Sequence, residues 1–194
     1  MNLKHPFAVA IIAAMTVATP AANAVENSGG DPRSFPIDDT LFVASGSDLR
    51  SVSSERLMNA TPEEVWAAWT TEIGWKSVYG PERPELHANI ELAVGGRYEW
   101  LFDGETGSNE CQVLSYLPPR MLSFSWNAPT AQPLSREKRT WVVIEIEPSD
   151  EHTTLVRTTH LGFGEGPHWD ETLTYFDNAW GHVLDQMVSN FANR

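Results

Sequence analysis

The sequence predicts a single α+β domain in which an antiparallel sheet curves around one long C-terminal helix. Six segments between residues 86 and 161 have the length and composition of strands, and no helical segment separates them. A pair of short helices is expected before these strands, and a long amphipathic segment follows them. Strands that follow one another directly form antiparallel sheets, and such a sheet buries its apolar face against the remaining helix.

The first elements are a strand and a capped helix. Weak alternation predicts a strand over residues 49–59. The next segment has the clearest helix start in the chain, because Thr61 can cap the free N–H groups and Pro62 suits the first helical position. Glu64 completes a capping box. A second short helix is expected shortly after this one, around Trp75.

The strands of the sheet show which of their side chains face inward. They are predicted over residues 86–94, 98–102, 111–117, 121–126, 141–147 and 154–161. Glu145 and Glu147 must face outward, so Ile144 faces inward with the other even-numbered apolar residues of its strand. The same test turns six aromatic and aliphatic side chains of two other strands inward: Tyr98, Trp100, Phe102, Leu122, Phe124 and Trp126. In the last strand, alternation alone does not decide whether Val156, Thr158 and His160 face inward.

A long helix is predicted over residues 169–191. Its apolar residues recur at steps of three and four and form one wide stripe. The stripe consists of Leu173, Phe176, Trp180, Val183, Leu184, Met187 and Phe191. Gly181 costs a helix about 1 kcal/mol relative to alanine, which suggests that another segment or a ligand approaches closely there.

Residues 1–24 predict a cleavable secretory signal. A positive start with Lys4 precedes an apolar run and a small-residue triplet that ends at Ala24, the expected cleavage site. The run is too short for a membrane span, which needs about 20 apolar residues. The expected protein is therefore periplasmic or secreted, with no membrane span after cleavage. Residues 25–47 are expected to form an arm or linker, and residues 48–194 the domain.

The charge and cysteine content exclude several classes of function. The formal net charge of −13 would repel the phosphates of nucleic acids, so we expect no nucleic-acid partner. The single cysteine, Cys111, excludes an intramolecular disulfide and any multi-cysteine metal site. The histidines lack the spacing of a helical metal motif, so no metal and no cofactor is expected.

Five phrases of the sequence resemble one superfamily in the same order. They are ATPEEVW at 60–66, GGRY at 95–98, LSFSW at 122–126, TLVRTTHLGF at 154–163 and WGHVLDQM at 180–187. Together they resemble the SRPBCC superfamily of START-like, helix-grip domains. The closest likeness is to the branch named after activators of the ATPase of the ninety-kilodalton heat-shock chaperone. The resemblance covers about residues 48–192, and the export signal would make this chain an exported member.

This resemblance implies a largely apolar cavity between the curved sheet and the C-terminal helix. In the superfamily such a cavity takes hydrophobic small molecules. The resemblance also places Val156, Thr158 and His160 on the cavity side. The expected ligand-binding residues are Tyr98, Trp100, Phe102, Leu122, Phe124, Trp126, Ile144, Val156, Thr158, His160, Phe176, Trp180 and Leu184. The glycine-rich loop over residues 162–166 is expected to gate the mouth of this cavity.

Three functions are compatible with these features. The first is a non-enzymatic, exported domain that binds a small hydrophobic molecule against aromatic walls. The second is a cyclase-like or hydrolase-like enzyme in which His160 works with Tyr98, Glu99 or Tyr116 as acid–base partners. The third is a co-chaperone-like module whose acidic surface docks a protein partner. The sequence favours the first and assigns no catalytic residue.

Overall fold

The computed structural model describes residues 50–79, 85–102 and 107–193 of the chain. The predicted signal and arm, residues 1–47, lie outside the described residues. The elements are, in chain order, β1 (Arg50–Met58), α1 (Pro62–Thr70), α2 (Glu72–Tyr79), β2 (His87–Ile90), β3 (Tyr98–Leu101), β4 (Gly107–Ser108), β5 (Val113–Leu117), β6 (Met121–Trp126), α3 (Pro133–Arg136), β7 (Thr140–Pro148), β8 (Thr154–Phe163) and α4 (Pro167–Ala192). None of the helices in this part of the chain is long and apolar enough to cross a membrane.

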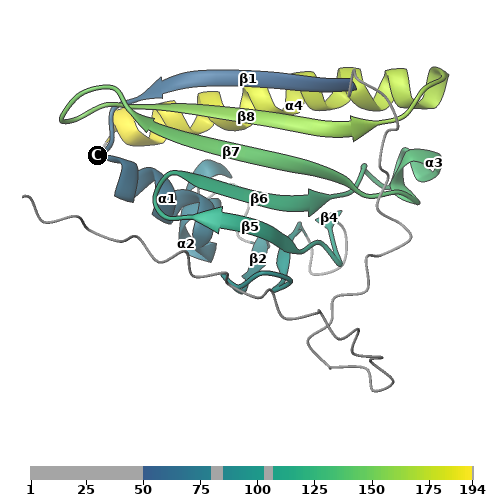
Figure 1. Cartoon of the computed structure of the whole chain (residues 1–194), viewed down its shortest axis with the longest axis horizontal. Helices are drawn as coiled ribbons and strands as arrows, with labels where there is room; N and C mark the ends of the chain where they lie inside the picture. Colours follow the sequence, from purple (N-terminus) through teal and green to yellow (C-terminus); the bar gives the residue numbers. More distant parts are fainter. Residues whose placement is uncertain (1–49, 80–84, 103–106, 194) are drawn as a thin grey trace, which may run out of the picture. The chain divides into compact units, whose positions relative to one another are not determined.

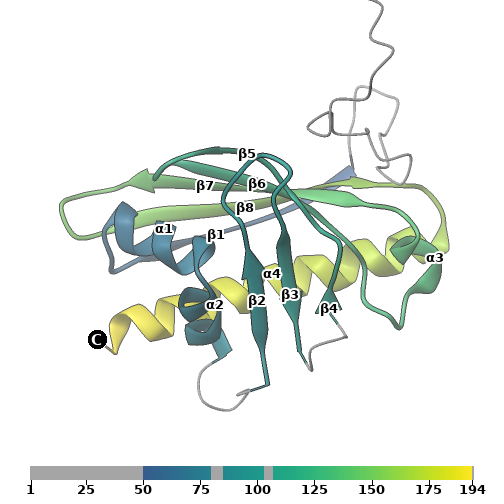
Figure 2. The same ribbon diagram turned by 90° about the horizontal axis from the view of Figure 1, so that it is seen from below.

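The predicted α+β fold class is confirmed. Five antiparallel strands form a sheet in the order β1-β8-β7-β6-β5, and α4 packs against it, with its closest contacts to β1 and β8 (Figure 1). The short helices α1 and α2 follow β1, as predicted. Helix α2 contacts the C-terminal part of α4, whereas α3 contacts the N-terminal end of α4 (Figure 2).

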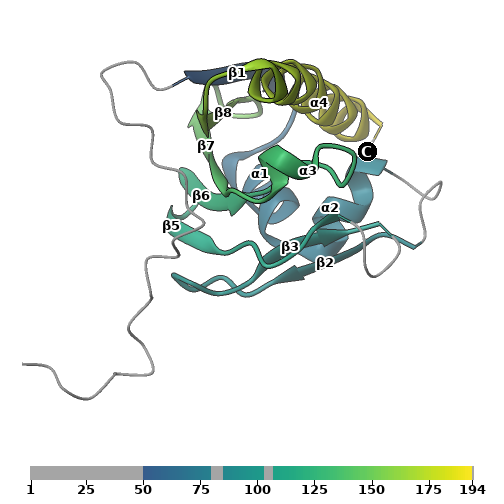
Figure 3. The same ribbon diagram turned by 90° about the vertical axis from the view of Figure 1, so that its right-hand side faces the viewer.

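The strands differ from the prediction in three respects: they form two sheets, the short strand β4 is added, and the helix α3 lies between β6 and β7. Strands β2, β3 and β4 make a separate three-stranded sheet, which an isolated bridge between Arg97 and Gln112 joins to the larger one. The chain turns sharply between the sheets, since Glu110 has a φ of 57° and the register shifts between Val113 and Ser115. A left-handed residue and a register shift both bend a strand. The second sheet therefore crosses below the first (Figure 3).

The capping box that predicted α1 is present. The Oγ1 of Thr61 accepts a hydrogen bond from the backbone N–H of Glu64 at 3.3 Å, and the Glu64 carboxylate accepts one from the N–H of Thr61 at 2.9 Å. The buried face of α1 consists of Val65, Ala68 and Trp69. The cap thus fixes where α1 begins and directs Trp69 into the core.

The predicted inward faces of the strands are confirmed for β7 and β8. In β7 the even-numbered apolar residues, including Ile144, are buried, whereas Glu147 is exposed. In β8, Val156, Thr158 and His160 are buried. On β6 the alternation of exposure is weaker, because Ser123 and Ser125 on the outer face are also covered.

Helix α4 extends two residues beyond the prediction at its N-terminus and is held to β1 by two ion pairs. Arg50 lies 2.6 Å from Asp170, and Arg56 lies 2.7 Å from Asp185. The expectation of a close approach at Gly181 is wrong. A Cβ placed there would stand 3.9 Å from the nearest side-chain atoms, an ordinary van der Waals distance. Nothing in the described packing therefore requires glycine at this position.

Candidate functional site

A pocket of about 170 Å³ lies between the middle of α4 and the strands that face it. Its walls come from β3 and the residue after it, from β4, from β6 and the segment that follows it, from α3 and from α4. The lining residues are Trp100, Phe102, Gly107, Ser108, Trp126, Asn127, Ala128, Pro129, Thr130, Arg136, Tyr175, Phe176, Ala179, Trp180 and Val183. The pocket thus sits where the family resemblance implied a cavity, between sheet and C-terminal helix, but it occupies only part of that space.

The structure divides the thirteen expected ligand-binding residues into two groups. Five of them line the pocket: Trp100, Phe102, Trp126, Phe176 and Trp180. The other eight do not line it and are buried in the packed core: Tyr98, Leu122, Phe124, Ile144, Val156, Thr158, His160 and Leu184. Trp69 of α1 and Trp75 of α2 pack around Tyr98, whereas His160 packs against Phe163, Phe176 and Trp180.

The filled part of the space centres on Trp69, Trp75 and Tyr98, which we call the closed end. Trp69 and Trp75 meet edge to face, with ring centroids 5.0 Å apart. The Trp75 indole N–H donates to the Tyr98 hydroxyl at 3.0 Å, and that hydroxyl donates to the carbonyl of Trp69 at 2.7 Å. Burial raises the pKa of Tyr98 above its ordinary value. A buried, neutral phenol with both hydrogen bonds made is a packing element.

His160 is the middle member of a buried chain of hydrogen bonds. The indole N–H of Trp180 donates to Nδ1 of His160 at 2.9 Å. Nδ1 is therefore the unprotonated nitrogen, and Nε2–H donates to Oγ1 of Thr140 at 2.6 Å. The Thr140 hydroxyl donates in turn to the carbonyl of Trp126 at 3.1 Å. We call this series the His160 relay; it connects α4, β8, β7 and β6.

The relay leaves no nitrogen of His160 available to a ligand. Desolvation by burial lowers the pKa of His160 to about 3, so the ring is neutral at ordinary pH. His160 does not line the pocket, whereas Trp180 and Trp126 at the two ends of the relay do. The ring therefore acts on the pocket only indirectly, by holding the position of these two walls.

The acid–base partners considered for an enzyme do not meet His160. Tyr98 bonds to Trp75 and Trp69 in the closed end. The Glu99 carboxylate accepts from the side chain of Asn89 at 3.1 Å and from the backbone N–H of Glu110 at 2.7 Å. Tyr116 lies opposite Leu122 at the edge strand β5. The arrangement in the described residues therefore gives His160 a structural role.

The walls of the pocket are a continuous set of aromatic rings. The ring centroids of Trp126 and Trp180 are 5.7 Å apart, and those of Trp100 and Trp126 are 6.2 Å apart. Trp100 also contacts Phe102 at 5.0 Å, and Phe176 stacks on Trp180 at 6.4 Å. Aromatic walls present a large apolar area and suit flat or ring-bearing molecules.

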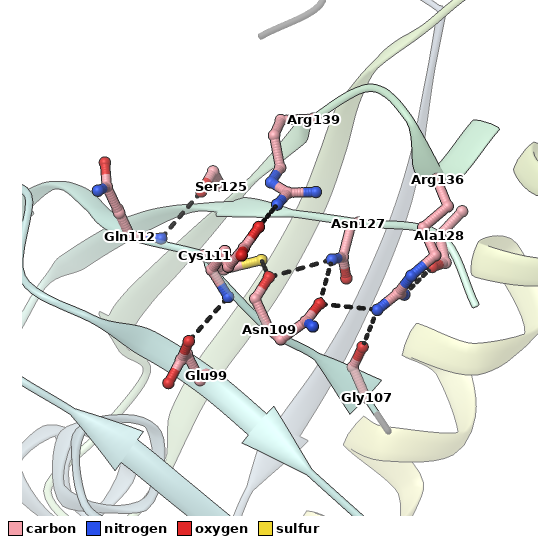
Figure 4. Close-up of polar contacts among 11 residues, drawn as sticks. Glu99, Gly107, Asn109, Cys111, Gln112, Ser125, Asn127, Ala128, Arg136 and Arg139 are labelled. Carbon is pink, nitrogen blue, oxygen red and sulfur yellow. Dashed lines mark hydrogen bonds and ion pairs between the residues drawn. The ribbon is translucent and has the colours of Figure 1, made fainter. Parts of the chain in front are cut away.

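One corner of the pocket is polar, and sequence reasoning missed it. Arg136 from α3 donates from Nη1 to the carbonyl of Ala128, and from Nη2 to the carbonyl of Gly107 and to Oδ1 of Asn109, both at 2.8 Å. Asn127 donates to the same Oδ1 at 3.1 Å (Figure 4). Burial and the charge of nearby Arg139 lower the pKa of Arg136.

Cys111 lies near this corner but is not a reactive thiol. It is fully buried, and desolvation raises its pKa to about 12. A thiol with such a pKa carries almost no thiolate at neutral pH, and the thiolate is the nucleophile. Among the described residues, no three His, Cys, Asp or Glu side chains lie together as a metal would require.

The expected gate does not border the pocket. None of residues 162–166 lines it, and the loop is packed in place. Arg50 donates to the carbonyl of Gly164 at 2.5 Å, and Phe163 is buried. A Cβ at Gly164 would stand 2.4 Å from the Trp169 ring. Glycine at this position permits close packing of the indole, so the loop is a tight connection between β8 and α4.

An antiparallel sheet closed by a long C-terminal helix, with a pocket between them, defines the helix-grip class of domains. Residues 59–192 match the family described as activator of Hsp90 ATPase homolog 1-like protein, and the chain belongs to this family. The family match confirms the resemblance to the SRPBCC superfamily and to this branch of it. No curated protein matches the sequence.

Several solved structures have the same fold. Protein MLL2253 from Mesorhizobium loti is 22% identical with a TM-score of 0.61, and the match covers 74% of this chain and 98% of that chain. The Aha1 dimer from Colwellia psychrerythraea is 17% identical with a TM-score of 0.55, covering 73% of this chain and 96% of that one. An HSP90 activator from Plasmodium falciparum is 18% identical with a TM-score of 0.50, covering 67% and 86%. At these identities the likeness establishes the fold alone.

Proposed function

We propose that this domain binds a small, ring-bearing hydrophobic molecule in the pocket between α4, β3 and β6. The observation that carries the proposal is the aromatic lining, in which Trp100, Trp126, Trp180 and Phe176 surround a space that no described side chain fills. Exposed apolar concavities of this kind are the usual sites of small-molecule binding. The other eight expected residues do not line the pocket; of these, Tyr98 and Phe124 pack against Trp126, and His160 bonds to Trp180.

The size of the pocket limits the ligand to about one ring system. A dry cavity of about 150 Å³ accommodates benzene, and this pocket measures about 170 Å³. A ligand that loses about 200 Å² of apolar surface to the walls gains roughly 5 kcal/mol from transfer, before the cost of its immobilisation. Larger molecules fit only if part of them protrudes past Tyr175, which is exposed at the rim.

Native mass spectrometry of the protein purified without denaturation tests this function. We expect a noncovalent adduct that disappears when the protein is denatured. Ala179→Phe should remove the adduct, because Ala179 lines the pocket and a phenyl group there occupies its volume. The matched control is Asp177→Phe, which puts the same ring on the exposed face of α4 and should keep the adduct. An adduct that survives Ala179→Phe contradicts the proposal.

We propose further that the protein is exported and that its mature chain begins at Val25. The positive start, apolar run and small-residue triplet of residues 1–24 support this. Fractionation of the producing cell, with N-terminal sequencing, tests it. A cytosolic protein that retains residues 1–24 would overturn the export proposal and leave the binding proposal untouched.

A second candidate function is a protein-interaction module, which the family's name favours. The acidic composition of the chain suits a basic partner. Cross-linking in the native compartment separates the candidates. A specific partner whose binding is unaffected by Ala179→Phe, together with no small-molecule adduct on the wild type, would favour the interaction module.

A further inference from the structure

The polar corner of the pocket, formed by Asn127 and Arg136, places hydrogen-bonding groups beside the apolar walls of the ligand site. An aromatic pocket that only bound hydrocarbon would leave its polar neighbours satisfied within the protein. Here Asn127 is 3% exposed and Arg136 is half-buried, yet both line the pocket. Both side chains bond to Oδ1 of Asn109, so they are neighbours on one side of the cavity (Figure 4).

Arg136 is a partly desolvated cation whose described hydrogen-bond partners are all neutral, and the nearby carboxylate of Glu110 is paired with Arg139. Its guanidinium has five N–H groups, of which three are directed at carbonyl or amide oxygens: those of Ala128, Gly107 and Asn109. Among the residues that the structure describes, no carboxylate lies within ion-pair distance of it. A cation in this position gains most from an anion, because charge-assisted hydrogen bonds are about twice as strong as neutral ones.

Asn127 presents a buried acceptor with no donor. Its Nδ2 donates to the carbonyl and to the side-chain oxygen of Asn109, both at 3.1 Å. Its Oδ1 is buried and has no hydrogen-bond partner in the described part of the chain. A buried acceptor without a partner costs about 1–3 kcal/mol. An O–H or N–H group on a bound molecule would remove that cost.

We infer that the ligand is an aromatic acid that carries a hydroxyl or amino group beside its carboxylate. The ring lies against Trp100, Trp126 and Trp180, the carboxylate accepts from the free N–H groups of Arg136, and the adjacent donor bonds to Oδ1 of Asn127. This inference rests on the proposed function, because it assigns the polar end of a molecule whose ring the aromatic walls hold.

Four probes separate this inference from the proposed function. Toluene has only the ring; mandelate has the ring, the carboxylate and an α-hydroxyl group. Phenylacetate lacks only the hydroxyl, and mandelamide lacks only the charge. Affinities are measured on the full-length mature protein by NMR titration. We expect mandelate to bind roughly tenfold or more tightly than mandelamide and about fivefold or more tightly than phenylacetate, as charged and neutral hydrogen bonds predict.

Two variants assign the differences to residues. Arg136→Gln keeps an N–H donor but removes the charge, so it should abolish the preference for mandelate over mandelamide. Asn127→Ala should abolish the preference for mandelate over phenylacetate. Toluene affinity is measured in each variant as the reference, so that each preference is compared with ring binding in the same protein. If a variant fails to fold, the wild-type probe series decides by itself.

The outcomes are distinguishable. Toluene binding with equal affinities for mandelate, mandelamide and phenylacetate would overturn the inference about the polar corner and leave the proposed function standing. Failure of all four probes to bind at this pocket would overturn both.

Discussion

The closed end and the pocket are built from the same residue types, yet one is filled and the other is open. At the closed end, Trp69 and Trp75 enter from α1 and α2 and complete the packing around Tyr98. At the pocket, Trp100 of β3 and Trp126 of β6 line the cavity, but the short helix α3 contributes Arg136 instead of an apolar ring. The side chains that the short helices α1, α2 and α3 contribute therefore decide whether neighbouring aromatic rings become part of the core or of a binding surface.

The largest expected difference between the two regions is in the cost of deleting a tryptophan. Trp75 and Trp100 contact each other at 4.8 Å, but only Trp100 lines the pocket. Trp75→Ala should lower the free energy of unfolding by about 3–5 kcal/mol, because it leaves a closed cavity. Trp100→Ala should cost less, since its space joins a pocket that is already open. Denaturant unfolding of both variants measures this, and equal costs would contradict the distinction.

Removing His160 should have the next largest effect. His160→Leu leaves the Trp180 N–H without its acceptor at the back of the pocket wall, at a cost of about 2–4 kcal/mol. Thr140→Ser, which keeps the hydroxyl, should cost clearly less. Thermal unfolding of both variants tests this. If the two variants unfold at the same temperature, the relay does not hold the wall.

The buried His160 also makes stability depend on pH. Its pKa is lowered to about 3 in the folded protein, against roughly 6.5 in an unfolded chain. Below pH 6.5 only the unfolded chain binds this proton, so stability is complete above that pH and falls by about 1.4 kcal/mol per pH unit down to about pH 3.

Denaturant unfolding between pH 4.5 and 7 measures this slope. His160→Gln should flatten it, because glutamine does not titrate. The carboxyl groups of Glu72 and Asp185, whose pKa values are lowered by Lys76 and Arg56 respectively, contribute a loss of the same sign at lower pH in both proteins. An unchanged slope in His160→Gln would show that His160 is accessible to protons in the folded state.

The smallest expected effect is a gain in stability, at a site outside the pocket lining. Gly181→Ala should raise the free energy of unfolding by about 0.4–1 kcal/mol, because alanine favours the helix and a Cβ there meets only ordinary contacts. Ligand binding should not change. A loss of stability would indicate a close approach at Gly181 that the described packing does not contain.

The sequence predicted an element correctly wherever a pattern of neighbouring residues allowed only one interpretation. The capping box at Thr61 and Glu64 located the start of α1, and the glutamates of β7 identified its inner face. The stripe in α4 located the last helix to within a few residues. Each of these features depends only on neighbours in sequence.

The extent of the pocket could not be predicted in the same way. Alternation shows that Phe124 and Trp126 both point inward, but it does not show that the ring of Tyr98 stacks on Phe124 at 4.0 Å while Trp126 is left facing a cavity. Arg136 and Asn127 were missed because α3 has only four residues and the segment before it shows neither the helical nor the strand periodicity of apolar residues. Polar residues in such segments acquire their roles only through contacts distant in sequence.

The most direct test of the central claim compares methyl groups in the two regions by NMR while ethylbenzene is titrated into the protein. Ala179 and Val183 line the pocket, whereas Val142 and Ile144 are buried in the core away from it. We predict saturable shifts of the Ala179 and Val183 methyl signals with those of Val142 and Ile144 nearly unchanged. No saturable shift at the pocket methyls up to the solubility limit of the probe would contradict a binding site between α4 and the sheet.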